Sequence, residues 1–169
     1  MTDMTLLAKQ IIIQNKFLSL ATSDREGNVW STPLSYSRDN DCNFYFTTTL
    51  DSRHIENIRK NPYVSFSIFD STRRVSDIDG LQIRGIAGEL EKEKLPDVVK
   101  NYYLQVFPDI EERKLWESPY ENFTLNEYPV YRFFQIVPIE ICKRDTDNID
   151  VDRTVPIDIE ELKAYMRKE

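Results

Sequence analysis

Large apolar residues alternate with small or polar ones along several short stretches of the chain, and this period of two is typical of half-buried β-strands. Short polar turns at 24–28 and 38–41 separate the first three stretches, which predicts an antiparallel meander there. The last stretch is expected to be interrupted near Pro138. In all, the pattern predicts six strands, at 17–23, 29–36, 44–49, 63–69, 81–90 and 129–142.

Helical segments are expected between and around these strands. A short helix should follow Asp51 and Ser52, both good N-cap residues, and should end before Pro62. The other predicted helices lie at 5–16, from Pro96 onward, at 109–116, and from a capping box at Asp158 and Glu161 through residue 167.

Six strands at short intervals with few helices favour a small antiparallel barrel. The predicted fold class is therefore mainly β with peripheral helices, in one domain over residues 1–169 whose barrel spans about 17–145. Gly85 and Gly88 are expected to mark bulges or close backbone approach within their strand.

Composition narrows the class of protein. A net charge of −7 opposes a clustered basic surface, so a nucleic-acid partner is not expected. The longest apolar run, 11–13, is too short to cross a membrane, and the N-terminus lacks a secretory pattern. Cys42 and Cys142 lie far apart without a CxxC or a histidine pair, so neither a metal site nor a disulfide framework is predicted. Ordinary thiols suit the reducing cytoplasm, which is the predicted location.

The segment from 44 to 62 carries the clearest chemistry. A strand that ends in hydroxyl residues runs directly into a helix, and helix N-termini attract anions through unpaired N–H groups and the macrodipole. Thr47, Thr48 and Ser52 offer hydroxyl donors, Arg53 a planar charged fork, and His54 a further donor. These residues together describe a phosphate cradle without a glycine loop. Residue types alone also fit an ordinary N-cap followed by a solvated arginine.

The order of these pieces resembles the FMN-binding split-barrel family of pyridoxamine 5'-phosphate oxidase-like proteins. The resemblance covers about residues 17–90. It rests on Leu18-Ser-Leu-Ala-Thr22 with the Gly27 turn, Trp30-Ser-Thr-Pro-Leu34, Phe46-Thr47, Ser52-Arg53, Asn61-Pro62-Tyr-Val64 and Leu81-Gln-Ile-Arg-Gly85. It implies a six-stranded antiparallel Greek-key split barrel that binds FMN.

The resemblance also implies roles for individual residues. The phosphate would be bound at Thr47, Ser52, Arg53 and the position of His54, while the backbone of 31–34 would lie along the isoalloxazine and Gln82 would approach the ring. The implied cofactor-binding set is Ser31, Thr32, Pro33, Leu34, Phe46, Thr47, Thr48, Ser52, Arg53, His54 and Gln82. Neither a catalytic residue nor a metal ligand is implied, because the flavin performs the electron transfer.

The family is typically dimeric, so a homodimer with cofactor sites at the subunit interface is implied. The apolar stripe of the helix after Pro96 could serve that contact or pack on its own barrel. Trp116, Tyr120 and Phe123 could cover a cofactor, although packing under a loop is favoured. Arg73 and Arg74 could steer an anionic substrate or could be loop charge.

Several positions depart from the pyridoxamine phosphate oxidases themselves. Those enzymes usually carry basic residues where this chain has Ser31, Tyr36 and His54, and Arg153 matches their C-terminal arginine motif only loosely. Oxidation of vitamin B6 is therefore not expected. The predicted function is FMN-dependent hydride or electron transfer with an unidentified small molecule. The alternatives are a non-enzymatic flavin or haem carrier or sensor, and a reductase that uses the deazaflavin F420.

Overall fold

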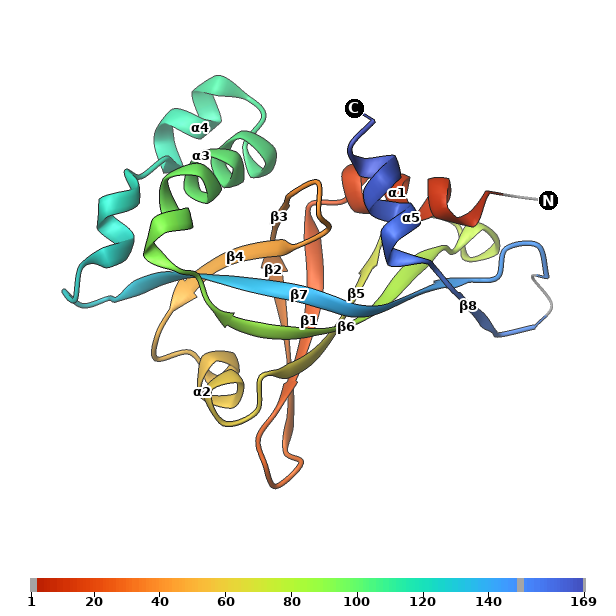
Figure 1. Cartoon of the computed structure of the whole chain (residues 1–169), viewed down its shortest axis with the longest axis horizontal. Coiled ribbons are helices and arrows are strands. Elements are labelled where there is room, and N and C mark those ends of the chain that lie inside the picture. The colour runs from red at the N-terminus through yellow and green to blue at the C-terminus, as the bar shows by residue number, and fades with distance from the viewer. Residues whose placement is uncertain (1–2, 149–150, 169) are drawn as a thin grey trace.

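A computed structural model describes residues 3–148 and 151–168, and over them one antiparallel sheet curls into a barrel with helices at its ends (Figure 1). The strands run in the order β2-β1-β5-β6-β7-β4-β3, with β8 paired to β7. Their bounds are β1 Phe17–Ser23, β2 Val29–Ser35, β3 Ser37–Arg38, β4 Phe44–Thr49, β5 Tyr63–Phe69, β6 Gly80–Glu89, β7 Tyr131–Arg144 and β8 Thr154–Pro156. The predicted split barrel is confirmed. The six expected strands become eight over the described residues, because a two-residue and a three-residue strand are added.

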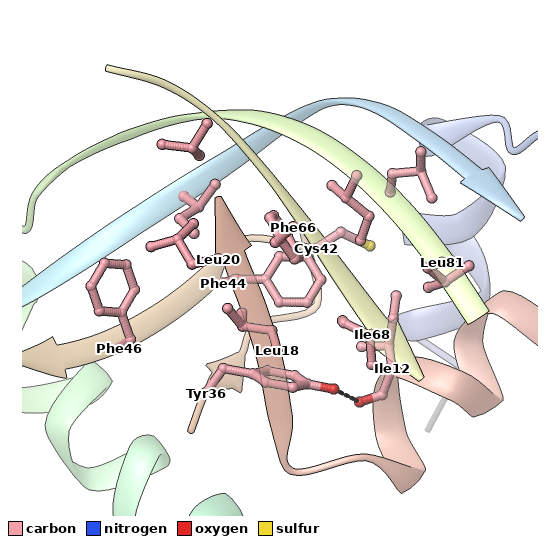
Figure 2. Close-up of a cluster of buried hydrophobic side chains, with 14 of the residues drawn as sticks. Ile12, Leu18, Leu20, Tyr36, Cys42, Phe44, Phe46, Phe66, Ile68 and Leu81 are labelled. Atoms are coloured by element: carbon pink, nitrogen blue, oxygen red, sulfur yellow. Dashed lines mark hydrogen bonds between the residues drawn. The ribbon is translucent and has the colours of Figure 1, made fainter. Parts of the chain in front are cut away.

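The predicted three-strand meander is wrong in one respect. Among the described residues β2 pairs only with β1, and the chain then bends at Tyr36 so that the short β3 pairs with β4. Because β2 and β3 are consecutive in sequence but lie at opposite ends of the strand order, this bend closes the barrel at one end. Tyr36 is buried at the bend and its hydroxyl donates to the carbonyl of Ile12 at 2.7 Å (Figure 2).

The barrel interior is filled by the inward-facing residues of the strands. Phe44 lies at its centre, with ring centroids 4.9 Å from Phe66 and 5.5 Å from Tyr36 (Figure 2). Leu18 and Leu20 of β1 alternate inward with period two, as the sequence pattern predicts.

The helices lie at Met4–Gln14 (α1), Arg53–Lys60 (α2), Leu95–Val106 (α3), Ile110–Trp116 (α4) and Ile159–Met166 (α5), with 3₁₀ turns at Val75–Asp77 (η1), Lys92–Lys94 (η2) and Tyr120–Thr124 (η3). All the predicted helices are confirmed. α1 and α5 lie side by side, so the first and last helices of the chain pack together (Figure 1). Asp158 caps α5 by accepting from the backbone N–H of Glu161, as expected. No helix among the described residues is long and apolar enough to cross a membrane.

The apolar stripe of α3 packs against its own barrel. Val98, Val99, Tyr102 and Tyr103 are buried in a second cluster that contains Phe133 of β7. The stripe is therefore not available to a second subunit, which settles the alternative that the sequence left open.

Gly85 is the point where two strands adjust their register. The β6–β7 pairing shifts between Arg84 and Gly85, and Ile139 becomes the extra residue opposite them. A Cβ at Gly85 would lie 2.6 Å from Ile136 Cγ2, so the expected close approach is confirmed there. At Gly88 it is wrong, because an added Cβ would meet no atom within 4 Å. The expected interruption near Pro138 is a bulge within a continuous β7, since the strand absorbs the extra residue without ending.

Candidate cofactor site

The barrel is split beyond the Tyr36 bend. β2 pairs with β1 along one edge, β4 pairs with β7 along one edge, and no pairing joins β2 to residues 46–49 of β4 over the described part of the chain. Alternate residues of β2 therefore direct N–H and C=O groups away from β1. Near the bend, Ser35 Oγ and Tyr102 Oη of α3 lie 2.6 Å apart. The open part of the split thus lies toward the other end of β2.

Helix α2 begins at this open end, immediately after β4 (Figure 1). Ser52 occupies its N-cap position as predicted, but its hydroxyl makes no capping hydrogen bond. In α1, α4 and α5 an aspartate at the same position does make one. The N–H of Ser52 donates to the Thr49 carbonyl and that of Ile55 to the Ser52 carbonyl. The first turn of α2 therefore offers the N–H groups of Arg53 and His54, with the positive end of its macrodipole, to another partner.

The Ser52 hydroxyl belongs instead to a short polar chain. Thr48 Oγ1 donates to Ser52 Oγ at 3.5 Å, and Ser52 Oγ lies 3.2 Å from Nε2 of His54. Three of the predicted phosphate-binding residues are thus brought together. Thr47 points elsewhere, since its hydroxyl donates to the carbonyl of Arg132 at 3.1 Å.

Phe46 lies beneath this chain and is a core residue. Its side chain is fully buried, and its ring stacks on Phe134 at 5.6 Å and lies 6.2 Å from the His54 ring. Only its backbone can face a ligand.

Arg53 follows Ser52 directly in the sequence, and its guanidinium carbon is 4.5 Å from the centroid of the Trp30 ring. The stacking holds the planar fork in one orientation through a cation–π interaction. Trp30 is absent from the sequence-derived site. The available signal was a tryptophan at the exposed start of a strand, but its pairing with Arg53 depends on how α2 docks.

Burial shifts the pKa values of His54 and Cys42 in opposite directions. Burial lowers the pKa of His54 below its ordinary value of 6.5, because desolvation penalises the imidazolium form. Burial raises the pKa of the Cys42 thiol to about 11, so this cysteine is protonated at neutral pH and unsuited to nucleophilic attack.

A second group of predicted residues lies on the outer face of the sheet. Ser31 of β2 and Gln82 of β6 line one open groove of about 520 Å³, together with Ser19, Ser65, Ser67 and Cys142. Pro33 shares the outer face with Ser31, while Thr32 and Leu34 point to the inner side. Among the described residues, the buried Thr32 Oγ1 has no hydrogen-bond partner. The predicted residues thus fall into two groups. One group, with Thr48, Ser52 and Arg53, lies at the start of α2, and the other, with Ser31 and Gln82, lies along the groove.

The other residues singled out in the sequence have structural partners. Arg73 pairs with Asp70, and Arg153 donates to Asp145 and lowers the pKa of that carboxyl. Phe123 is buried against Phe133, which agrees with packing under a loop. Trp116 stacks on Phe107 with ring centroids 6.3 Å apart, and its other surface is exposed. Over the described residues no cluster of three histidine, cysteine, aspartate or glutamate side chains could hold a metal ion.

Comparison with known proteins identifies the family. The model for the family described as pyridoxamine 5'-phosphate oxidase matches residues 4–124, well over half of the chain. The chain belongs to this family. The matched region contains β1 to β6 and α2, and therefore both groups of the candidate site.

Individual relatives agree with this assignment. The UPF0306 protein plu4501 of Photorhabdus laumondii is 34% identical over 103 residues, which cover 60% of this chain and 67% of that protein. A haem-binding protein of Mycobacterium smegmatis superposes with a TM-score of 0.72 at 14% identity, covering 97% of this chain and 61% of the other. HutZ, a haem storage protein of Vibrio cholerae, superposes with a TM-score of 0.57 at 17% identity, covering 77% and 86%. At these identities the two superpositions establish a shared fold only.

Proposed function

We propose that this member of the family binds FMN at the open end of the barrel split and uses it for hydride or electron transfer with a small molecule. The observation that carries the proposal is that Thr48 and Ser52 meet at the uncapped N-terminus of α2, whose first residue, Arg53, is held on the Trp30 ring. Two hydroxyls, a guanidinium and a helix N-terminus are the donors that a phosphate monoester requires.

Hydrogen-bonding groups are also available for the flavin ring of the cofactor. The free backbone edge of β2 can hydrogen-bond the edge of a planar ring, as can the buried, unpartnered Thr32 hydroxyl. Gln82 can approach the ring from the outer groove. When bound, FMN would supply the redox chemistry. The chain's own residues would orient it, and none of them is assigned as a general acid or base.

Haem is the main alternative, because two of the structural neighbours carry it by name. The chain has a single histidine, whose side chain is only 5% exposed and whose Nε2 contacts Ser52. Axial ligation by His54 would require its withdrawal from the core. Hydroxyl donors at a helix N-terminus also suit a phosphate better than a haem iron. For F420, the acidic composition disfavours an oligoglutamate tail.

We further propose that two copies pair through the outer face of the sheet. Phe17, Tyr63, Phe69, Ile86 and Val137 all lie on this face and are 40% or more exposed. They form two apolar patches, Phe17 with Phe69 and Tyr63 with Ile86 and Val137, one at each end of the polar groove. Exposed apolar patches of this kind mark an interaction surface. A second copy is the natural occupant, because the face adjoins the groove at Ser31 and Gln82, and pairing would enclose that groove.

Ile86→Glu is expected to convert the dimer into a monomer at micromolar concentration, because a carboxylate would be desolvated in the apolar patch that Ile86 shares with Tyr63 and Val137. Sedimentation equilibrium measures the change. Leu115→Glu is the matched control, since Leu115 is 81% exposed on α4 and should leave the mass unchanged. A wild-type protein that sediments as a monomer would contradict the pairing.

Arg53→Ala is expected to weaken FMN by about 1.5–3 kcal/mol, roughly 10- to 150-fold in Kd, because a charge-assisted phosphate contact is lost. Titration of apoprotein followed by flavin fluorescence measures it. Arg59→Ala, in the last turn of the same helix, is the control and should bind FMN normally. Riboflavin, which lacks the phosphate, should bind wild type and Arg53→Ala equally. If wild type takes up no FMN at all, the proposed function is wrong.

A further inference from the structure

We propose that His54 couples binding of the FMN phosphate to uptake of a proton, so that this residue strengthens cofactor binding as the pH falls below neutrality. The coupling rests on the FMN site proposed above and concerns the regulation of that site. His54 acts through Ser52 and is therefore a positioning residue.

The geometry around Ser52 provides the switch. Thr48 donates to Ser52 Oγ, and Nε2 of His54 lies 3.2 Å away on the same oxygen. A hydroxyl has one proton to donate. When Nε2 is unprotonated it accepts that proton, and Ser52 has none for a ligand. When Nε2 carries a proton, in the imidazolium or in the neutral Nε2–H tautomer, it donates to Ser52 Oγ, and the hydroxyl proton of Ser52 is free to turn toward a phosphate oxygen. Of these two forms, only the imidazolium also brings a positive charge to the phosphate.

Among the described residues, no charged side chain contributes to the lowered pKa of His54, and burial is its cause. From β4 the Phe46 ring lies 6.2 Å from the imidazole ring. Two nearby arginines are engaged with other groups: Arg53 stacks on Trp30, and Arg132, opposite Thr48, lies 3.4 Å from Glu89.

A phosphate held by Ser52 would therefore be the first negative charge beside the imidazole. An anion raises the pKa of a nearby histidine, so the bound state holds the proton at a pH where the free state has lost it. By linkage, the same ligand binds more tightly to the protonated protein. The gain appears as the pH falls through the pKa of the complex and stops growing below the lowered pKa of the free protein.

The phosphate itself titrates in the opposite sense. Its second pKa is about 6, so acid also converts the ligand to the more weakly bound monoanion. His54→Gln separates the two effects, because glutamine keeps a hydrogen-bonding group and cannot gain a charge. His54→Lys supplies a cation that does not titrate near neutrality. Riboflavin reports any effect of pH on the ring site alone.

The test measures Kd for FMN and riboflavin from about pH 8 to about pH 6 in wild type, His54→Gln and His54→Lys. The ratio of the His54→Gln Kd to the wild-type Kd for FMN should rise as the pH falls, by at most about tenfold per pH unit, which is the limit for one linked proton. It should stay flat for riboflavin. The corresponding ratio of the His54→Gln Kd to the His54→Lys Kd should not change with pH.

Calorimetry in buffers of different ionisation enthalpy provides an independent readout on the wild type, which serves even if the variants fail to fold. Near pH 6.5, FMN should bind with net proton uptake relative to riboflavin, whereas titration of the phosphate alone would release protons. A flat Kd ratio, or net proton release by wild type, overturns the role of His54 while the FMN site stands. Absence of FMN binding at every pH overturns the site itself.

Discussion

Asp79→Ala is expected to lower the free energy of unfolding by about 3–5 kcal/mol, the largest effect of any substitution of a charged residue considered for this protein. The Lys143 side chain is fully buried on β7, and its Nζ donates to Asp79 Oδ1 at 2.8 Å and to the Arg144 carbonyl at 3.2 Å. Removing the carboxylate leaves an ammonium group in the interior with only one neutral acceptor. Urea denaturation followed by circular dichroism measures the loss.

The matched control is an exposed pair of the same type. Glu111→Ala on α4 breaks the contact with Lys114, whose side chain is 61% exposed, and should cost less than about 0.5 kcal/mol. The double variant Asp79→Leu, Lys143→Met should recover most of the stability, because an apolar pair of similar volume needs no desolvated charge. A loss below about 1 kcal/mol for Asp79→Ala would show that water reaches Lys143.

Phe46→Ala is expected to cost about 3–5 kcal/mol, because it removes a fully buried ring from the core between Phe134 and His54. Phe46→Leu should cost less, since it leaves a smaller cavity. Leu115→Ala is the control: Leu115 is 81% exposed on α4, outside the proposed pairing face, and its substitution should cost less than about 1 kcal/mol. The test compares the urea midpoints of the variants, provided that their m-values are equal.

Phe46→Ala should also weaken FMN binding in protein that remains folded, because the ring supports the imidazole that contacts Ser52. Phe46→Leu should retain most of the affinity. Equal FMN affinity in Phe46→Ala and wild type would show that the core beneath His54 does not position the phosphate end.

The elements of this fold could be predicted from local patterns. Period-two alternation located all six long strands, and Ser52 with Pro62 bounded α2, because pleat geometry and capping depend on residues close in sequence. The short β3 and β8 escaped prediction, since two or three residues carry no periodic signal. They pair only because a distant strand lies beside them.

The sequence by itself determined that this is a small, mainly β protein, and its motifs pointed to the family that the comparison then identified. It also predicted an anion-binding segment between β4 and α2, which stays a prediction. Tertiary structure alone decided the rest. Tyr36 turns the chain across the barrel, leaves β2 with a free edge and opens the split at α2. The docking of α2 on the sheet places Arg53 on Trp30 and buries His54 against Phe46. These contacts join residues whose sequence separation carries no periodic or capping signal, because they depend on how whole elements dock.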